Sequence, residues 1–190
     1  MRTSVSFTIS VFMIFCLGLW VCGCGTGPGP RAQGSCCGLW TTLRTQGYDS
    51  ALKYRAGDLP AYRVVIRLSL LSEHGRNEFL DGFETAYKDA NENQKGKEYR
   101  TILSQALDGG FYEEAIIQGK KYVSGETTDA RVQDLISGSV GLSRSSGLGW
   151  KAGYIVGFAQ EMARQTEGFE EGFYQQAETK YNALRGALGV

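Results

Sequence analysis

Glycine followed directly by an aromatic residue recurs along the body of this chain, and this pattern most constrains how the chain can fold. Seven of the 17 glycines after Pro60 precede Phe, Tyr or Trp, against about two expected from the 12% aromatic content. In three segments, which begin at Gly82, Gly153 and Gly168, small residues recur at i and i+4 and aromatic residues at i+1 and i+5. Residues four apart share one helix face, so each segment predicts a helix with a small-residue stripe beside an aromatic stripe. Gly costs a helix up to about 1 kcal/mol relative to Ala, and we expect close packing against a second helix to offset this cost.

The 130 residues after Pro60 contain no further proline, which also favours helices. We therefore predict an all-α fold, a compact bundle of about five helices with Gly-aromatic contacts between them. Apolar spacing places the helices at 75–94, 98–122, 128–137, 150–165 and 168–187. Residues 91–96 are expected to form a break, Gly125 to end a helix, and the Ser/Gly-rich residues 137–149 to form a long loop.

Residues 61–71 carry a mixed signal. Tyr62, Val64, Ile66, Leu68 and Leu70 alternate with the residues between them, as in a strand. Residues 58–60, Asp-Leu-Pro, instead resemble a helix start, with the Asp as the cap and the Pro in the first turn. Because a lone strand would have no obvious partner in this chain, we favour a helix.

Two similar hexapeptides indicate an internal repeat. Residues 110–115 (GFYEEA) match residues 172–177 (GFYQQA) at a shift of 62, whereas Gly82 and Gly153 are 71 residues apart. The two halves therefore align only with a short insertion. We interpret this pattern as a duplicated helix pair.

The first 24 residues have the pattern of an export signal. Arg2 is the only charged residue before Arg31, and an apolar run follows it at 11–21. The run is short for a membrane span, which needs about 20 apolar residues. All five cysteines lie within the first 37 residues, so the body is neither a disulfide scaffold nor a thiolate metal site.

The residues after this run, Val21-Cys22-Gly23-Cys24, resemble the lipobox of bacterial lipoproteins, with Cys22 where Ala or Ser is usual. The resemblance covers these four residues and the preceding signal only. It implies cleavage after Gly23, lipidation of Cys24 and attachment to the membrane through this N-terminal lipid. Gly25, in place of Asp, implies the outer membrane of the bacterial cell envelope, with the domain facing the periplasm. A cleaved signal without lipid and an uncleaved signal anchor are the alternatives.

We therefore divide the chain into a signal peptide (1–23), a lipidated Cys with a flexible tether (24–37) and a single helical domain (38–190). The tether is rich in Gly and Pro and has little apolar surface to bury. Cys36 and Cys37 at its end are interpreted as small packing residues or, in an oxidising periplasm, as partners in a bond between chains.

No recognisable catalytic arrangement occurs in the sequence, and we predict a protein without enzymatic activity, metal or cofactor. His74 is the only histidine and has no second His or Cys at metal-ligand spacing. Residues 137–141 resemble a nucleophile elbow without its first Gly, and residues 147–153 resemble a phosphate loop with the wrong Gly spacing. The acidic pairs at 113–114 and 170–171 are expected to face water. Twenty basic residues balance 20 acidic ones, which argues against nucleic acid as a partner.

The aromatic residues of the Gly-rich helices are the candidate functional residues. We expect them mainly to fill the core, with some lining a cavity or an interaction surface. The sequence favours a protein that acts by protein contact at the envelope, in assembly or in immunity or exclusion. The alternative is a helical carrier or sensor that binds an apolar small molecule between the aromatic faces. The candidates are Phe83, Tyr87, Phe111, Tyr112, Tyr154, Phe158, Phe173 and Tyr174.

Overall fold

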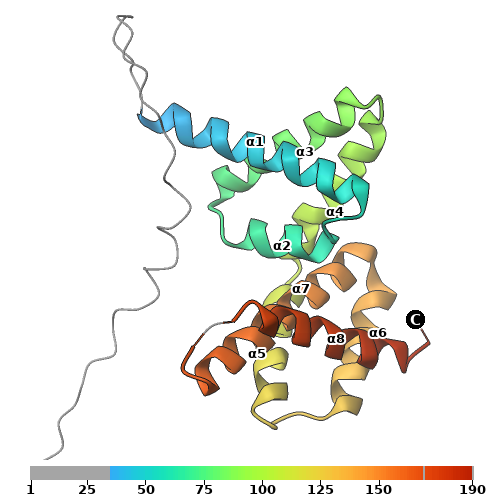
Figure 1. Cartoon of the computed structure of the whole chain (residues 1–190). Coiled ribbons are helices and arrows are strands. Elements are labelled where there is room, and N and C mark those ends of the chain that lie inside the picture. The colour runs from blue at the N-terminus through green and yellow to red at the C-terminus, as the bar shows by residue number, and fades with distance from the viewer. Residues whose placement is uncertain (1–34, 169, 190) are drawn as a thin grey trace, which may run out of the picture. The chain divides into compact units, whose positions relative to one another are not determined.

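A computed structural model describes the backbone of residues 35–168 and 170–189, and the side chains from residue 42 on. These residues form eight α-helices and no strand, which confirms the all-α prediction for this part of the chain (Figure 1). The proposed lipidation site, Cys24, and the side chains of Cys36 and Cys37 lie outside what is described. No helix in the described part is long and apolar enough to cross a membrane. The helices are α1 (Ser35–Ala56), α2 (Ala61–Ser69), α3 (Glu73–Asp89), α4 (Asn93–Asp108), α5 (Phe111–Val123), α6 (Asp129–Leu142), α7 (Arg144–Gln165) and α8 (Gly172–Gly186).

The prediction of about five helices is wrong for three reasons. The sequence pattern did not indicate α1, which begins at Ser35 and so includes the last three residues of the expected tether. The single helix expected at 98–122 is divided into α4 and α5, because Gly110 has φ +72° and interrupts the helix just before α5. The mixed segment 61–71 contributes α2, which buries Tyr62, Val65 and Leu68 on one helical face, and Pro60 precedes it in place of an Asp cap.

The prediction of a long loop at 137–149 is also wrong. These residues belong to α6 and α7, which only Ser143 separates. The Ser143 side chain accepts a hydrogen bond from the Ser146 backbone N–H at 3.0 Å and so caps α7. Gly149 serves close packing, since a Cβ there would lie 2.2 Å from the carbonyl oxygen of Ala106 on α4. Gly149, one of the glycines that suggested a loop, is therefore a position where the backbone of a neighbouring helix approaches α7, whereas Gly138 and Gly141 are open helix positions.

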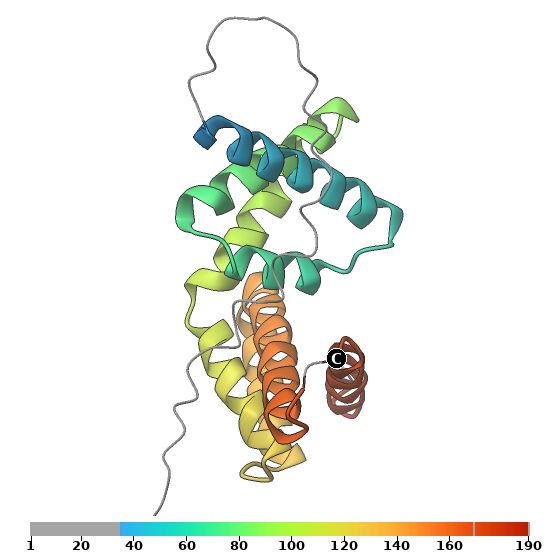
Figure 2. The same ribbon diagram turned by 60° about the vertical axis from the view of Figure 1, so that its left-hand side comes forward.

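Most of the close glycine contacts join two further pairs of helices. In the pair of α1 and α3, a Cβ on Gly82 would lie 1.8 Å from the carbonyl oxygen of Arg44. In the pair of α5 and α7, which run side by side in Figure 2, a Cβ on Gly157 would lie 2.0 Å from the carbonyl oxygen of Ile116. Gly47, Gly119 and Gly153 make similar approaches to backbone atoms. The helix backbones therefore touch where these glycines lie, as the small-residue stripes at Gly82 and Gly153 predict.

The third Gly-aromatic segment does not form such a stripe. Residues 166–171 connect α7 to α8, and Glu167 has φ +55°, which ends the regular helix. A Cβ on Gly172 would meet no atom within 4 Å, and one on Gly168 would only reach the carbonyl oxygen of Thr166 at 4.0 Å. The spacing of small and aromatic residues is the same as in the other two segments, but no second helix approaches here.

The eight helices form two sets that share three helix contacts, although α6 packs on α7 whereas α2 packs on α7 and not on α3. In α1–α4 and again in α5–α8, the first helix packs on the third, the third on the fourth and the second on the fourth. The third helices align at a shift of 71, and each follows a Ser that caps it, Ser72 or Ser143. The hexapeptide match at a shift of 62 pairs the start of α5 with that of α8, which hold different places in the set. The matched pairs of α3 and α7 are Phe79 with Trp150, Gly82 with Gly153, Phe83 with Tyr154, Ala86 with Gly157 and Tyr87 with Phe158.

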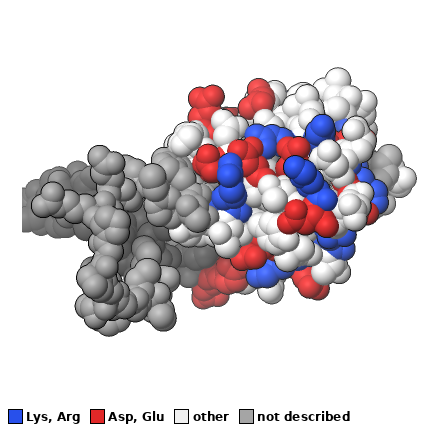
Figure 3. All heavy atoms as spheres, turned by 90° about the horizontal axis from the view of Figure 1, so that it is seen from above, with Lys and Arg blue, Asp and Glu red and all other residues white. Residues whose placement is uncertain are grey.

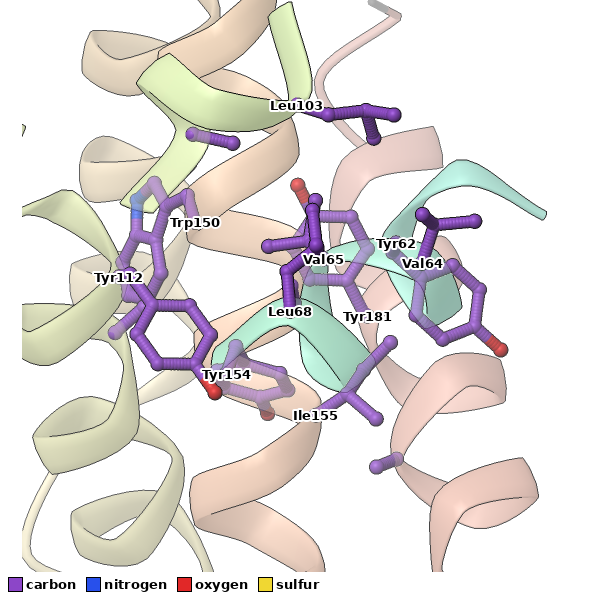
Figure 4. Packing of buried hydrophobic residues seen from close by; sticks show 14 of the residues in the cluster. Tyr62, Val64, Val65, Leu68, Leu103, Tyr112, Trp150, Tyr154, Ile155 and Tyr181 are labelled. Carbon is purple, nitrogen blue, oxygen red and sulfur yellow. The ribbon is translucent and has the colours of Figure 1, made fainter. Parts of the chain in front are cut away.

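The core is continuous across the two sets of helices. The short helix α2 of the first set packs on α7 of the second, and α4 also packs on α7. Figure 4 shows Val64, Val65 and Leu68 of α2 gathered with the rings of Tyr154 and Tyr181. These side chains are almost fully buried. The contact between the sets therefore belongs to the core of one helical domain.

Candidate functional site

A cavity lies where the two sets of helices meet. Its volume is about 470 Å³, which falls within the usual range for small-molecule pockets, roughly 300–1,000 Å³. Every helix except α5 contributes to its wall. The lining residues are Tyr54, Ala61, Val64, Phe83, Tyr99, Ile102, Leu103, Val140, Ser143, Arg144, Gly147, Leu148, Lys151, Tyr181 and Arg185.

The inner wall of this cavity is apolar and aromatic. Val64, Phe83, Leu103 and Tyr181 are at most 3% exposed and carry the wall into the core. Tyr54 packs edge-on against Tyr99, with ring centroids 5.1 Å apart and planes at 78°. Rings from α1, α3, α4 and α8 therefore enclose space into which an apolar group would fit.

Two tyrosines of the wall, Tyr54 and Tyr181, are held in the neutral form. Burial raises the pKa of Tyr181 to about 12, and the ring of Tyr154 packs against it. Burial and a hydrogen bond with Tyr99 raise the pKa of Tyr54 as well. The hydroxyl groups of Tyr54 and Tyr181 are therefore neutral hydrogen-bonding groups and bring no negative charge to the cavity.

Three basic residues line the same cavity, and no Asp or Glu is among its described lining residues. Arg144 and Arg185 are exposed, whereas the Lys151 side chain is only 20% exposed. The Arg144 guanidinium lies over the Tyr99 ring, 5.4 Å from its centroid. On the face shown in Figure 3, by contrast, basic and acidic side chains are interspersed. The described lining of the cavity therefore includes basic but no acidic side chains, on a chain with zero net charge.

Lys151 belongs to a polar network that joins α2, α7 and α8. Its Nζ donates to Oε1 of Glu178 and to Oδ1 of Asn182, both at 3.2 Å, and it lies 4.7 Å from the centre of the Tyr62 ring. The Tyr62 hydroxyl donates to the other carboxylate oxygen of Glu178 at 2.5 Å. Burial alone would raise the pKa of Glu178, but the bonds from Tyr62 and Lys151 outweigh burial and lower it. The network therefore holds Lys151 beside an ionised carboxylate at neutral pH.

The structure separates the eight candidate aromatic residues instead of gathering them at one site. Phe83 lines the cavity, and Tyr87 lies on a neighbouring shallow surface with Tyr54 and Tyr99. Tyr112 and Tyr174 line a second, smaller cavity of about 290 Å³. The remaining four lie in the core or at a helix start: Tyr154, Phe158 and Phe173 are buried, and Phe111 is half-buried at the first residue of α5.

The sequence pattern missed most of the cavity. Tyr54, Tyr99 and Tyr181 do not follow a glycine, so the Gly-aromatic criterion passed over them. Lys151 lies in the segment 147–153 that resembled a phosphate loop, but the structure places it within α7. No local pattern indicated that Arg144 and Arg185, on different helices, line one cavity.

Other groups considered from the sequence lie at the surface. His74 is exposed in the first turn of α3, and the acidic pairs at 113–114 and 170–171 are exposed as expected. In the part of the chain that is described, no group of three or more His, Cys, Asp or Glu side chains is placed to hold a metal ion. The cavity is therefore the strongest candidate site.

We compared the chain with protein-family models, with curated proteins and with solved structures. None of them matched the chain. The function proposed below therefore depends on the residues and geometry described above.

Proposed function

We propose that this protein is a membrane-tethered carrier or sensor whose helical domain binds an apolar small molecule in the cavity between its two sets of helices. The observation that carries the proposal is the cavity of about 470 Å³ with its buried aromatic and aliphatic wall. A site of this size and lining buries most of the surface of a small ligand, and burial of apolar surface favours binding. No enzymatic activity is part of the proposal.

Protein contact, the other function expected from the sequence, has less support. Leu52, Leu70, Ile117 and Leu142 are large apolar side chains that are exposed by 43–69%. They lie on α1, at the end of α2, on α5 and on α6, and single exposed apolar residues are ordinary on a protein surface. The cavity is the more specific feature, so we place ligand binding first.

The proposed location rests on the sequence near Cys24. Lipidation there would tether the helical domain to a bacterial membrane, and the Gly at position 25 favours the outer membrane facing the periplasm. Metabolic labelling with a radioactive fatty acid tests this part, with a Cys24→Ser variant as the control. Label on the wild type and none on the variant supports it, whereas equal or absent label contradicts it.

We further infer that the two sets of helices arose by duplication. The three shared helix contacts and the alignment of α3 with α7 at a shift of 71 support this inference. The cavity lies where the two sets meet, so its wall combines residues from both. Duplication thus accounts for a binding site that forms between two similar sets of helices.

Photo-crosslinking tests ligand binding at the cavity itself. We would embed the full chain in nanodiscs of phosphatidylcholine, irradiate it with a diazirine-bearing long-chain alcohol and map the labelled peptides by mass spectrometry. We expect saturable labelling within residues 99–103 and 144–151 that excess dodecanol removes. Mapping by residue is needed because the bilayer also takes up the probe.

A matched pair of substitutions distinguishes binding in the cavity from non-specific labelling of the protein surface. Ala61→Phe places a ring in the cavity wall, whereas Ala130→Phe places the same ring on an exposed face of α6. We expect Ala61→Phe to remove most of the labelling and Ala130→Phe to leave it unchanged, with circular dichroism confirming that both variants fold. Labelling that does not saturate, or that Ala61→Phe leaves intact, contradicts the proposed function.

A further inference from the structure

We propose that the ligand of this cavity is an amphipathic anion, with an apolar body in the aromatic interior and an acidic head group held at the mouth by Arg144, Lys151 and Arg185. This inference rests on the proposed function and names the chemical class of the ligand. Carboxylate and phosphate head groups share the chemistry that these residues recognise, namely acceptor oxygens with negative charge.

The first argument is the imbalance of charge around the cavity. Of its described lining residues, three are basic and none is acidic. Glu178 offsets the charge of Lys151, but Arg144 forms no ion pair with a described residue, and a neutral apolar ligand would offer it no charged acceptor. An anion at the mouth supplies that acceptor and forms charge-assisted hydrogen bonds.

The second argument is the order of polarity along the cavity. Val64, Phe83 and Leu103 are almost completely buried, whereas the arginines are exposed. Lys151 lies between these levels, with 20% of its side chain exposed. A ligand with one acidic end and an apolar body would match this order, since its charged end would stay near water.

The third argument concerns which cation is available. Lys151 is already beside Glu178, so that carboxylate offsets much of its charge. Arg144 forms no ion pair with any described residue, and its contact with the Tyr99 ring orients the guanidinium without using its N–H groups on a carboxylate. A planar guanidinium held in this way presents a fork that fits carboxylate or phosphate oxygens.

The start of α7 adds to the positive potential at the same place. Ser143 caps this 22-residue helix, and Ser143, Arg144 and Gly147 all line the cavity. The N-terminal end of a helix carries a partial positive charge of roughly half an elementary charge. It therefore adds to the positive charge of Arg144, the first residue of this helix.

Competition against the photo-crosslinking probe tests the head group directly. The competitors share one twelve-carbon tail: dodecanol, dodecylamine, dodecanoate and dodecyl phosphate. At mildly alkaline pH, where the carboxylate is ionised, we expect dodecanoate or dodecyl phosphate to compete about tenfold or more better than dodecanol. Dodecylamine should compete least. The relative strength of the two anions tells a carboxylate ligand from a phosphate ligand.

Variants that remove a positive charge show which residues cause the preference for anionic competitors. Arg144→Gln and Arg185→Gln should each reduce the preference for the anions over dodecanol, while labelling by the neutral probe persists. Arg131→Gln, on the exposed surface of α6 and outside the cavity lining, is the matched control and should leave the preference unchanged. Equal competition by all four compounds, with saturable labelling intact, overturns the anionic ligand and leaves the proposed function standing. Absence of saturable labelling by the neutral probe overturns the proposed function itself.

Discussion

Gly82→Ala would test whether helix contact through glycine holds the first set of helices together. A Cβ at this position would lie 1.8 Å from the carbonyl oxygen of Arg44, whereas ordinary contact starts at 3.4 Å. The α1 and α3 backbones would have to separate by about 1.6 Å at this point. A gap of even 0.5–1 Å forfeits about a quarter to a half of the dispersion attraction between facing atoms.

The expected loss follows from two opposing terms. Overpacking a core costs about 1–3 kcal/mol and occasionally more, and a rigid backbone neighbour places Gly82→Ala at the upper end. Replacing Gly by Ala in a helix gains up to about 1 kcal/mol. We therefore expect the free energy of unfolding to fall by about 2 kcal/mol or more, which lowers Tm by roughly 4–8 °C in a chain of this length.

Gly138→Ala is the matched control, because a Cβ there would meet no atom within 4 Å. This position is exposed in α6, so we expect a gain of about 0.5–1 kcal/mol from helix propensity alone. Urea denaturation followed by circular dichroism gives both values. If Gly82→Ala proved as stable as Gly138→Ala, the close contact of α1 with α3 would be refuted.

Three further predictions concern the polar groups of Tyr154, Glu178 and Tyr181. The Tyr154 hydroxyl is buried without a hydrogen-bond partner in the described structure, so Tyr154→Phe should raise the free energy of unfolding by about 1–3 kcal/mol in urea denaturation; a loss would show that the hydroxyl has a partner. The pKa of Glu178 is lowered in the folded state, so the carboxylate stabilises the fold fully above pH 4.5, the ordinary pKa of the group. This stabilisation is lost as the pH falls through the lower pKa of the folded state. Thermal melts from neutral to acid pH should therefore fall more steeply below 4.5 for the wild type than for Glu178→Gln, and parallel curves would contradict the network. Burial raises the pKa of Tyr181 from 10.0 to about 12, so stability should fall as pH rises above 10.0, and Tyr181→Phe should reduce that fall in alkaline urea titrations.

Local patterns in the sequence predicted the helices that depend on short-range interactions. The i, i+4 spacing at Gly82 and Gly153 predicted α3 and the middle of α7, because a helix forms by bonds between residues four apart. The same spacing at Gly168 failed, since it specifies a face that a second helix can approach and cannot supply that helix. The loop prediction for the Ser/Gly-rich residues 137–149 failed for the converse reason. Gly149 is required because the backbone of Ala106 on α4, 43 positions earlier in the sequence, approaches it closely.

The candidate site was less predictable than the fold. Of the eight aromatic residues singled out, Phe83 alone among them lines the main cavity described here. Tyr54, Tyr99 and Tyr181 complete its aromatic wall, and they come from α1, α4 and α8. A cavity forms where side chains from several elements fail to fill the space between them, and this is not encoded in the neighbours of any one residue.

The helical character of the described chain and the close-packing stripes at Gly82 and Gly153 could be predicted from the sequence, because both depend on spacing within a few residues. The three helix contacts that α1–α4 and α5–α8 share, and the cavity between the two sets, are visible only in the folded chain. The tertiary structure also decided that Arg144, Lys151 and Arg185 line that cavity together. Net charge is counted along the chain, but binding depends on where the charges lie in space. Arg144 and Arg185, which are 41 positions apart in the sequence, come to line one cavity only through the packing of the helices.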